Sequence, residues 1–183
     1  MISIKDIQAA RETISTSIIQ TPILSSQTIS KKYANELFIK AEHLQKTGSF
    51  KIRRAANKVM LEARKGATHV VAASSGNHGQ AVSSIAQRLG LKSTIVVPED
   101  AALCKQEAIR AYQGDLELCG TTSPERLTRA AEISQSEGAI FIPPYDDPAI
   151  MAGQGTSGLE ILEQLRPSGT RKANGGSGLR RKL

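Results

Sequence analysis

With 183 residues, of which 39% are hydrophobic, the chain is long enough for one ordinary domain core, and no apolar run approaches the roughly 20 residues of a membrane span. Its formal net charge of +7 comes from its end, because residues 166–183 hold six of the 24 basic residues and no acidic one. The nearly neutral remainder and an aromatic content of 3% disfavour nucleic-acid binding.

The patterns of apolar residues predict alternating helices and strands. In chain order they are a helix at 4–18, a short helix at 26–34, a strand at 36–42, a helix at 50–65, a strand at 69–73, a helix at 78–89, a strand at 93–97, a helix at 105–112, a strand at 116–119, a helix at 124–137, a strand at 139–142 and a helix at 150–165. This alternation predicts βαβ units and an α/β fold with a mainly parallel sheet. Residues 166–183 are polar and aperiodic, which predicts a disordered basic tail.

The N-terminal residues and the two cysteines bear on the cellular location and on metal binding. Met1 to Ala10 lack a basic stretch followed by an apolar one, so we expect a cytoplasmic protein without a membrane partner. Cys104 and Cys119 show no metal-ligand spacing, and we expect them to be reduced and to bind no metal.

A polar loop follows the predicted strand 69–73 and opens the next helix. It reads Ser74-Ser75-Gly76-Asn77-His78-Gly79-Gln80. Free backbone N–H groups and the positive end of the helix dipole make such a junction an anion site, and it lies at the strand edge where ligands bind. Taken alone, the loop is more simply interpreted as an ordinary βα turn capped by serine or asparagine.

A second candidate is Lys51, at a predicted loop-to-helix transition beside Phe50. A lysine placed against apolar surface loses stabilisation of its charge, so its pKa falls and it becomes a better nucleophile. The alternative is a solvated surface lysine, which is the more common situation for an isolated lysine.

Together the two loops resemble a known pair of motifs. Ser49-Phe50-Lys51-Ile52-Arg53 followed by residues 74–80 is similar to the signature of fold-type II pyridoxal-phosphate enzymes, and most of all to serine/threonine dehydratases and serine racemases. Thr21-Pro22, Ile95 to Pro98 and Ile150 to Thr156 agree with it. The resemblance runs from about residue 4 to residue 165.

The resemblance implies a tryptophan-synthase-β-like architecture, with a parallel sheet, flanking helices and a large domain that is truncated here. Residues 1–40 would begin the large domain, 41–142 would form the small domain, 143–165 would return to the large domain, and 166–183 would be the tail.

The resemblance also implies roles for individual residues. Lys51 would bind pyridoxal 5'-phosphate covalently and move the proton at the substrate Cα, Phe50 would pack beside the pyridine ring, and Asn77 would bind the phenolic oxygen. Ser75 would face Cα from the opposite side as a second base. The substrate carboxylate would be bound by Ser74, Ser75, Asn77, His78 and Arg126, although an exposed helix arginine is the alternative for Arg126.

The activity implied is an ammonia-lyase reaction that converts L-threonine or L-serine to a 2-oxo acid and ammonia, as in isoleucine biosynthesis. The resemblance further implies a homodimer for a full-length parent. Racemisation of serine through Ser75 is one alternative, and an inactive paralogue that acts by interaction is another.

Two departures from the family pattern bear on activity. Arg54 stands where glycine is usual, and we expect it to crowd the cofactor. Gly175 to Leu179 have the spacing of the family's phosphate loop, but polar residues replace the apolar strand before it. We therefore expect weak or absent catalysis by this chain.

Overall fold

The computed structural model describes residues 1–74 and 76–165. Its helices are α1 (Ile4–Ile14), α2 (Gln27–Lys32), α3 (Lys51–Arg64), α4 (Asn77–Leu89), α5 (Leu103–Ala111), α6 (Ser123–Glu137) and α7 (Pro148–Gln164), with a 3-10 turn η1 (Glu42–Leu44). The strands are β1 (Ile23–Ser25), β2 (Phe38–Lys40), β3 (His69–Ala73), β4 (Lys92–Val97), β5 (Asp115–Leu118) and β6 (Ile140–Phe141).

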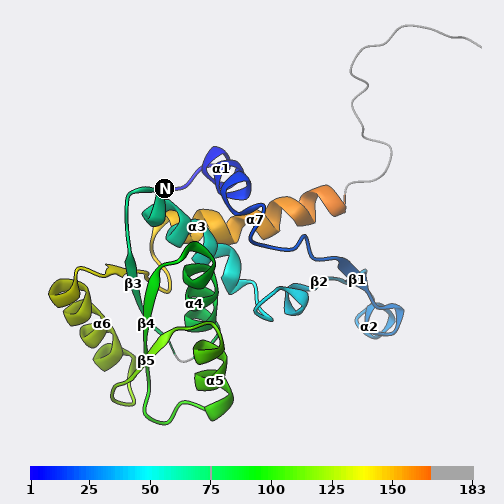
Figure 1. Cartoon of the computed structure of the whole chain (residues 1–183). Coiled ribbons are helices and arrows are strands. Elements are labelled where there is room, and N and C mark those ends of the chain that lie inside the picture. The colour runs from blue at the N-terminus through cyan, green and yellow to red at the C-terminus, as the bar shows by residue number, and fades with distance from the viewer. Residues whose placement is uncertain (75, 166–183) are drawn as a thin grey trace, which may run out of the picture.

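A four-stranded parallel sheet with the order β5-β4-β3-β6 forms the centre of the fold. Helix α6 covers one face, whereas α4 and α5 cover the other (Figure 1). Every residue of β3 is buried, as expected for a central strand that is covered on both faces. The predicted α/β fold with a mainly parallel sheet and flanking helices is confirmed.

The N-terminal segment differs most from the predicted elements. Strand β1 was not predicted, and it pairs with β2 in an antiparallel ribbon of three residues each, too short to show an alternating pattern. The predicted strand 36–42 shrinks to β2 and gives way to η1. Helix α1 ends at Ile14 instead of residue 18. Directly after it, the hydroxyl of Ser15 donates a hydrogen bond to the carbonyl of Glu12.

Close helix packing fixes the position of α3 against its neighbours α4 and α7. At Gly153 of α7, an added Cβ would lie 2.7 Å from the carbonyl oxygen of Arg53 and 2.9 Å from the Cα of Arg54. The absence of a side chain at Gly153 therefore lets α7 rest directly on the first turn of α3.

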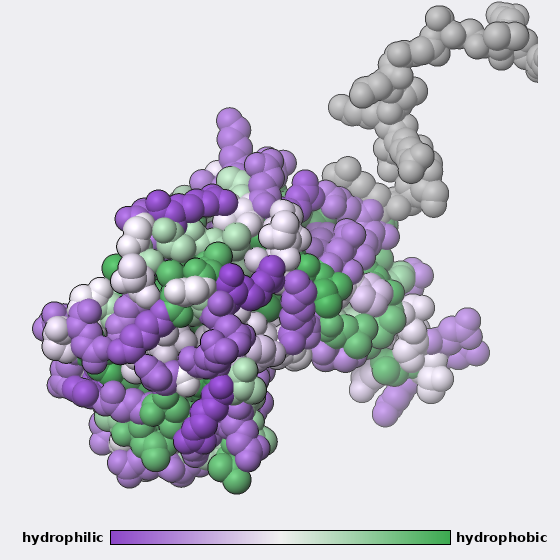
Figure 2. Space-filling model, in the orientation of Figure 1, coloured by the Kyte–Doolittle hydropathy of each residue, from purple (hydrophilic) through white to green (hydrophobic). Residues whose placement is uncertain are grey.

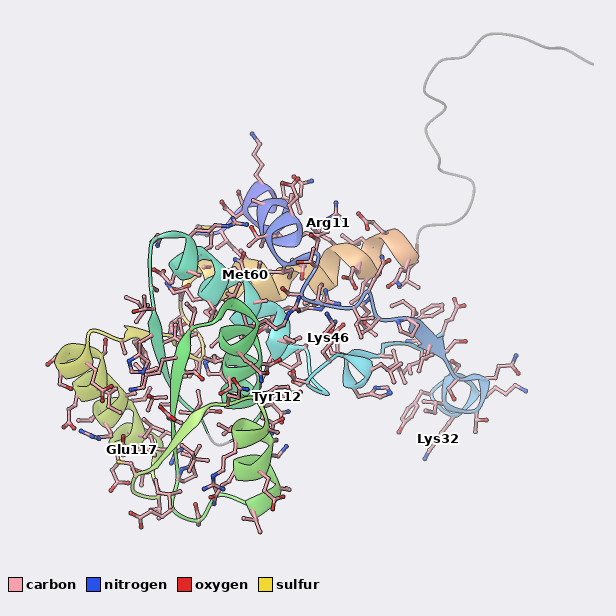
Figure 3. The ribbon with its side chains drawn as sticks, viewed as in Figure 1. Arg11, Lys32, Lys46, Met60, Tyr112 and Glu117 are labelled. Carbon is pink, nitrogen blue, oxygen red and sulfur yellow. The ribbon has the colours of Figure 1, made fainter. Side chains whose placement is uncertain are left out.

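The outer surface has both ion pairs and apolar patches. Arg11 lies between α1 and α7 (Figure 3), and its Nη1 is 2.5 Å from Oε1 of Glu163. Figure 2 shows green apolar residues beneath α5 and between α7 and the β1–β2 ribbon. Leu103, Leu118 and Leu24 are among the exposed apolar side chains.

Some predictions fall beyond what the structure describes. Ser75, the basic tail 166–183 and the glycine-rich stretch Gly175 to Leu179 all lie outside the described residues. The division into two domains stays a prediction. Within residues 1–74 and 76–165, no helix combines the length and apolar character needed to cross a membrane.

Candidate active site

A cavity of about 150 Å³ lies at the carboxyl end of β3. Side chains from the first turns of α3, α4 and α6 and from the loop before α7 surround it. The described residues that line it are Lys51, Arg54, Ala73, Ser74, His78, Ser123, Arg126, Leu127, Pro144 and Tyr145. None of these is acidic, and four of them carry basic nitrogen groups.

Lys51 is the first residue of α3, and its side chain lines the cavity. Its backbone N–H donates to the hydroxyl of Ser49, which helps to start the helix. Burial lowers the pKa of the Lys51 ammonium, and the positive charges of Arg54 and Lys105 lower it further. Lys51 therefore has the partly buried, cationic surroundings that favour a neutral, nucleophilic amine.

The hydroxyl of Ser74 is used within its own loop. It accepts hydrogen bonds from the backbone N–H groups of Gly76, at 3.0 Å, and Gly79, at 2.9 Å. Ser74 therefore satisfies free N–H groups at the start of α4, as in the turn interpretation of this loop. Because this hydroxyl already forms hydrogen bonds within the loop, direct binding of a substrate carboxylate is a secondary role for Ser74.

Asn77 is held by a residue that the motifs did not identify. Nζ of Lys105, on α5, donates to Oδ1 of Asn77 over 3.0 Å. This contact places the carbonyl side of the amide toward Lys105 and leaves its NH₂ group as a donor. Within the described residues, Asn77 and Phe50 do not line the cavity, and Phe50 is 37% exposed.

His78 is buried, with 3% of its surface exposed. Burial, followed by the positive charge of Arg54, lowers its pKa to about 4, so the ring is neutral near pH 7. Nε2 lies 3.2 Å from the carbonyl oxygen of Ile142, which accepts only, so the ring proton is on Nε2. Nδ1 is then an acceptor without a partner in the described structure, which does not favour the predicted role of binding a carboxylate.

Arg126 lies in the first turn of α6 and is only 7% exposed, so the alternative of an exposed helix arginine is wrong. Its Nη2 donates to the hydroxyl of Ser123 at 3.1 Å, whereas its buried Nη1 has no hydrogen-bond partner among the described residues. A buried donor that lacks a hydrogen-bond partner favours the binding of an anion.

Arg54 is the second buried guanidinium at the cavity, with 8% of its surface exposed. Its Nη1 donates to the carbonyl of Pro144, and its buried Nε has no partner in the described part of the chain. Burial lowers the pKa of Arg54, and no carboxylate opposes that effect.

The structure brings together Lys51, Ser74 and His78 from the two motifs and Arg126, which was a candidate outside them. In the sequence, Arg54 stands out only as a departure from the family pattern, although its place three residues after Lys51 puts both on one helix face. Lys105 carried no local signal, because its contact with Asn77 joins residues that are 28 positions apart.

Comparisons with known proteins agree with this geometry. A family model described as pyridoxal-phosphate dependent enzyme matches residues 14–177. The catabolic L-threonine dehydratase TdcB of Escherichia coli is 42% identical over 168 residues, which cover 90% of this chain and 50% of that protein. The serine racemase of Schizosaccharomyces pombe is 40% identical over 164 residues, covering 88% of this chain and 50% of that protein.

The solved structures show the same likeness. A pyridoxal 5'-phosphate-dependent aspartate racemase matches with a TM-score of 0.86 and 37% identity, over 90% of this chain and 52% of the racemase chain. The chain thus spans about half the length of the relatives that it matches.

Proposed function

This chain belongs to the pyridoxal-phosphate dependent enzyme family, and from that premise we propose that it serves the ammonia-lyase reaction of L-threonine or L-serine, with Lys51 as the cofactor-binding and proton-transferring residue. The observation that carries the proposal is the position of Lys51. It opens α3, lines the cavity at the end of β3 and has a lowered pKa among cations.

The residues that line the cavity, together with Asn77 and Phe50 beside them in the chain, fit pyridoxal phosphate. The amine of Lys51 is suited to attack an aldehyde because burial and neighbouring positive charge favour its neutral form. Asn77 has an amide NH₂ left to donate to the phenolic oxygen, since Lys105 occupies its carbonyl side. We assign the ring-facing position to Phe50, which immediately precedes Lys51.

The bound cofactor would supply an electron sink for charge that develops at the substrate Cα. The chain's own residues do the remaining work. With the cofactor bound, Arg126 would hold the α-carboxylate, and the free amine of Lys51 would remove the proton from Cα. Departure of the β-hydroxyl and hydrolysis then give a 2-oxo acid and ammonia.

His78 takes a different role from the one that the motif implied. Because its ring is neutral and its Nδ1 is an acceptor, His78 can receive a hydrogen bond from a substrate hydroxyl or ammonium group. Carboxylate binding then rests on Arg126, assisted by loop groups that include Ser74.

The test of the proposed function is covalent capture of the cofactor. The purified chain is incubated with pyridoxal phosphate, reduced with borohydride to make the linkage permanent, and mapped by peptide mass spectrometry. We expect the label on Lys51 and its loss in Lys51→Ala. Lys46→Ala removes an exposed lysine just before α3 and should leave the label in place. Labelling spread over surface lysines, or unchanged in Lys51→Ala, would refute the proposal.

Racemisation is the second candidate, because a serine racemase is among the relatives. The predicted second base, Ser75, lies outside the described residues. Incubation with L-serine, followed by chiral analysis and a 2-oxo acid assay, separates the two reactions. Formation of 2-oxo acid without D-serine supports the lyase, and D-serine without 2-oxo acid supports the racemase.

The finer predictions about setting belong to the same proposal. We place the enzyme in the cytoplasm, as a homodimer in its full-length form, acting on a small amino acid. A part in isoleucine biosynthesis is a weaker choice than a catabolic one, because the E. coli relative is named as catabolic.

A further inference from the structure

Helix α5 packs against α4 (Figure 1) and approaches the polar loop that opens α4 at two of its glycines. The side chain of Lys105 passes over Gly76, where an added Cβ would lie 3.5 Å from its Cδ and 3.7 Å from its Cε. A Cβ added at Gly79 would lie 3.3 Å from Cδ1 of Ile109. Because Lys105 and Ile109 are four residues apart, they share one face of α5, and this face lies on the loop.

The ammonium group of Lys105 has a neutral amide as its described hydrogen-bond partner. Its Nζ donates to Oδ1 of Asn77 over 3.0 Å, and within residues 1–74 and 76–165 Lys105 forms no ion pair. An ammonium group can only donate, so the contact fixes which end of the amide faces α5 and leaves the NH₂ group of Asn77 as a donor. Lys105 therefore orients Asn77 while its own charge stays unbalanced.

This charge acts on Lys51, at the start of α3. Burial lowers the pKa of Lys51 most, followed by the positive charge of Arg54 and then by that of Lys105. The other titratable side chains at the cavity, from α4, α6 and the loop before α7, are His78, Arg126 and Tyr145. None of the described lining residues is acidic, so no carboxylate there offsets the effect of these cations on Lys51.

From these contacts we propose that Lys105 is a positioning residue for the reaction at Lys51. Its ammonium group holds the amide of Asn77 so that the NH₂ group is the donor to the phenolic oxygen of the cofactor, and its charge acts on the amine of Lys51 from α5. The inference deepens the proposed function, on which it rests for the bond between Asn77 and the cofactor.

The effect of the charge can be measured without the cofactor. Competitive acetylation with acetic anhydride over the neutral and alkaline range, followed by peptide mass spectrometry, gives the titration of the Lys51 amine. In Lys105→Met its midpoint should move to higher pH because a neighbouring positive charge is removed, and acetylation of Lys51 at neutral pH should slow roughly three- to fivefold. Lys105→Arg keeps the charge and should stay near the parent. An unchanged midpoint in Lys105→Met would overturn the proposal.

A matched control comes from the same helix. Arg110→Met removes an exposed cation from the last turn of α5 and should leave the titration of Lys51 unchanged. A shift in Arg110→Met as large as that in Lys105→Met would refute a specific role of Lys105. If Lys105→Met does not fold, Lys105→Gln is an uncharged polar replacement at this half-exposed position and gives the same readout.

The orientation of Asn77 is tested with two aldehydes. Capture at Lys51 by borohydride reduction is compared for pyridoxal phosphate and for its 3-deoxy analogue, which lacks the phenolic oxygen. Any change in the amine of Lys51 affects both aldehydes and cancels in their ratio. The advantage of pyridoxal phosphate should fall roughly 5- to 10-fold in Asn77→Ala, as expected for one hydrogen bond, and about threefold in Lys105→Met.

The double variant shows whether the two residues act through one amide. It should lose no more of this advantage than Asn77→Ala alone, because without Asn77 there is no amide for Lys105 to orient. Additive losses, or an advantage that is unchanged in Lys105→Met, would refute the positioning of Asn77. Failure of the proposed function is seen separately, as absence of a label on Lys51 with either aldehyde. The acetylation titration then still decides on Lys105, because it needs no cofactor.

Discussion

Arg53 and Arg54 are neighbours in α3 and both are buried, but their surroundings are opposite in charge. Arg53 is fully buried and forms ion pairs with Glu160, at 2.7 Å, and Glu42, at 2.8 Å. Arg54 contacts one backbone carbonyl and faces the cavity with Lys51 and His78. Successive helical residues point about 100° apart, so one turn of α3 presents these two environments to different neighbours.

The charge of Arg53 is balanced within the fold, whereas the charge of Arg54 remains available to a ligand. Around Arg53 the carboxylates of Glu42 and Glu160 complete the ion pairs, and Lys40 adds to the cluster through Glu160, at 2.5 Å. This cluster ties α3 to α7 and to the segment that contains η1. On the cavity side, the described lining residues include cations and a neutral histidine but no carboxylate. This arrangement is typical of an anion-binding site.

The largest expected effect comes from removing the compensated arginine. Arg53→Met leaves the buried carboxylate of Glu160 and the partly buried carboxylate of Glu42 without their main partner, so the free energy of unfolding should fall by about 3–5 kcal/mol. Arg54→Met loses one hydrogen bond and also removes an uncompensated buried cation, so its stability should stay within about 1 kcal/mol of the parent. Urea denaturation measures both variants.

Equal losses in these two variants would contradict the comparison, because they would mean that Arg54 also has a structural counter-charge. Lys46→Ala, at an exposed position with one long hydrogen bond to the carbonyl of Thr16, provides the baseline for a surface basic residue.

The cavity side of α3 could be predicted from the sequence better than the ion-pair cluster around Arg53. The strand β3, the loop after it and Lys51 were predicted because each carries a local signal: a β-branched run, glycines beside polar residues, and a motif. The cluster around Arg53 had no such signal, because Glu160 is 107 positions from Arg53 along the chain and Glu42 lies in a separate segment 11 positions before it. The ribbon β1–β2 was missed for a similar reason, since its three-residue strands are stabilised by pairing with each other.

The second prediction concerns the pKa of His78, which depends on the positive charges on the cavity side. Its pKa of about 4 in the folded chain is below the roughly 6.5 of an unfolded histidine. Between these values the unfolded chain binds more protons, so stability rises with pH and is lost as the pH falls from about 6.5 toward 4. The total is about 3 kcal/mol, and no further loss comes from His78 below its folded pKa.

The difference between the parent and His78→Gln isolates this contribution from that of the carboxylates, when urea denaturation is repeated from pH 7 to pH 4. In Arg54→Met, the pKa of His78 measured by NMR should rise, because the charge of Arg54 helps to lower it. Arg64→Met, in the last turn of α3, should leave it unchanged. A His78 pKa that does not move in Arg54→Met would show that the charge of Arg54 does not contribute to it.

The smallest expected effect tests the contact that fixes both arginines in place. Gly153→Ala adds a methyl group 2.7 Å from the backbone oxygen of Arg53 and 2.9 Å from the Cα of Arg54, and backbone atoms on a packed helix cannot move aside cheaply. Helix α7 must shift, and with it Glu160, so the free energy of unfolding should fall by about 1–3 kcal/mol. Gly158→Ala lies on the same helix with open space around it and should raise stability by about 0.5–1 kcal/mol.

The pair of glycine variants also shows how far the two sides of α3 are independent. Glu160 is on α7, whereas the cavity-lining residues come from α3, α4, α6 and the loops beside them. A shift of α7 should therefore weaken the ion pairs of Arg53 first, and the pKa of His78 should stay unchanged in folded Gly153→Ala. A change in that pKa together with a loss of stability would mean that the packing of α7 on α3 also positions Arg54, and that the two environments are coupled through Gly153.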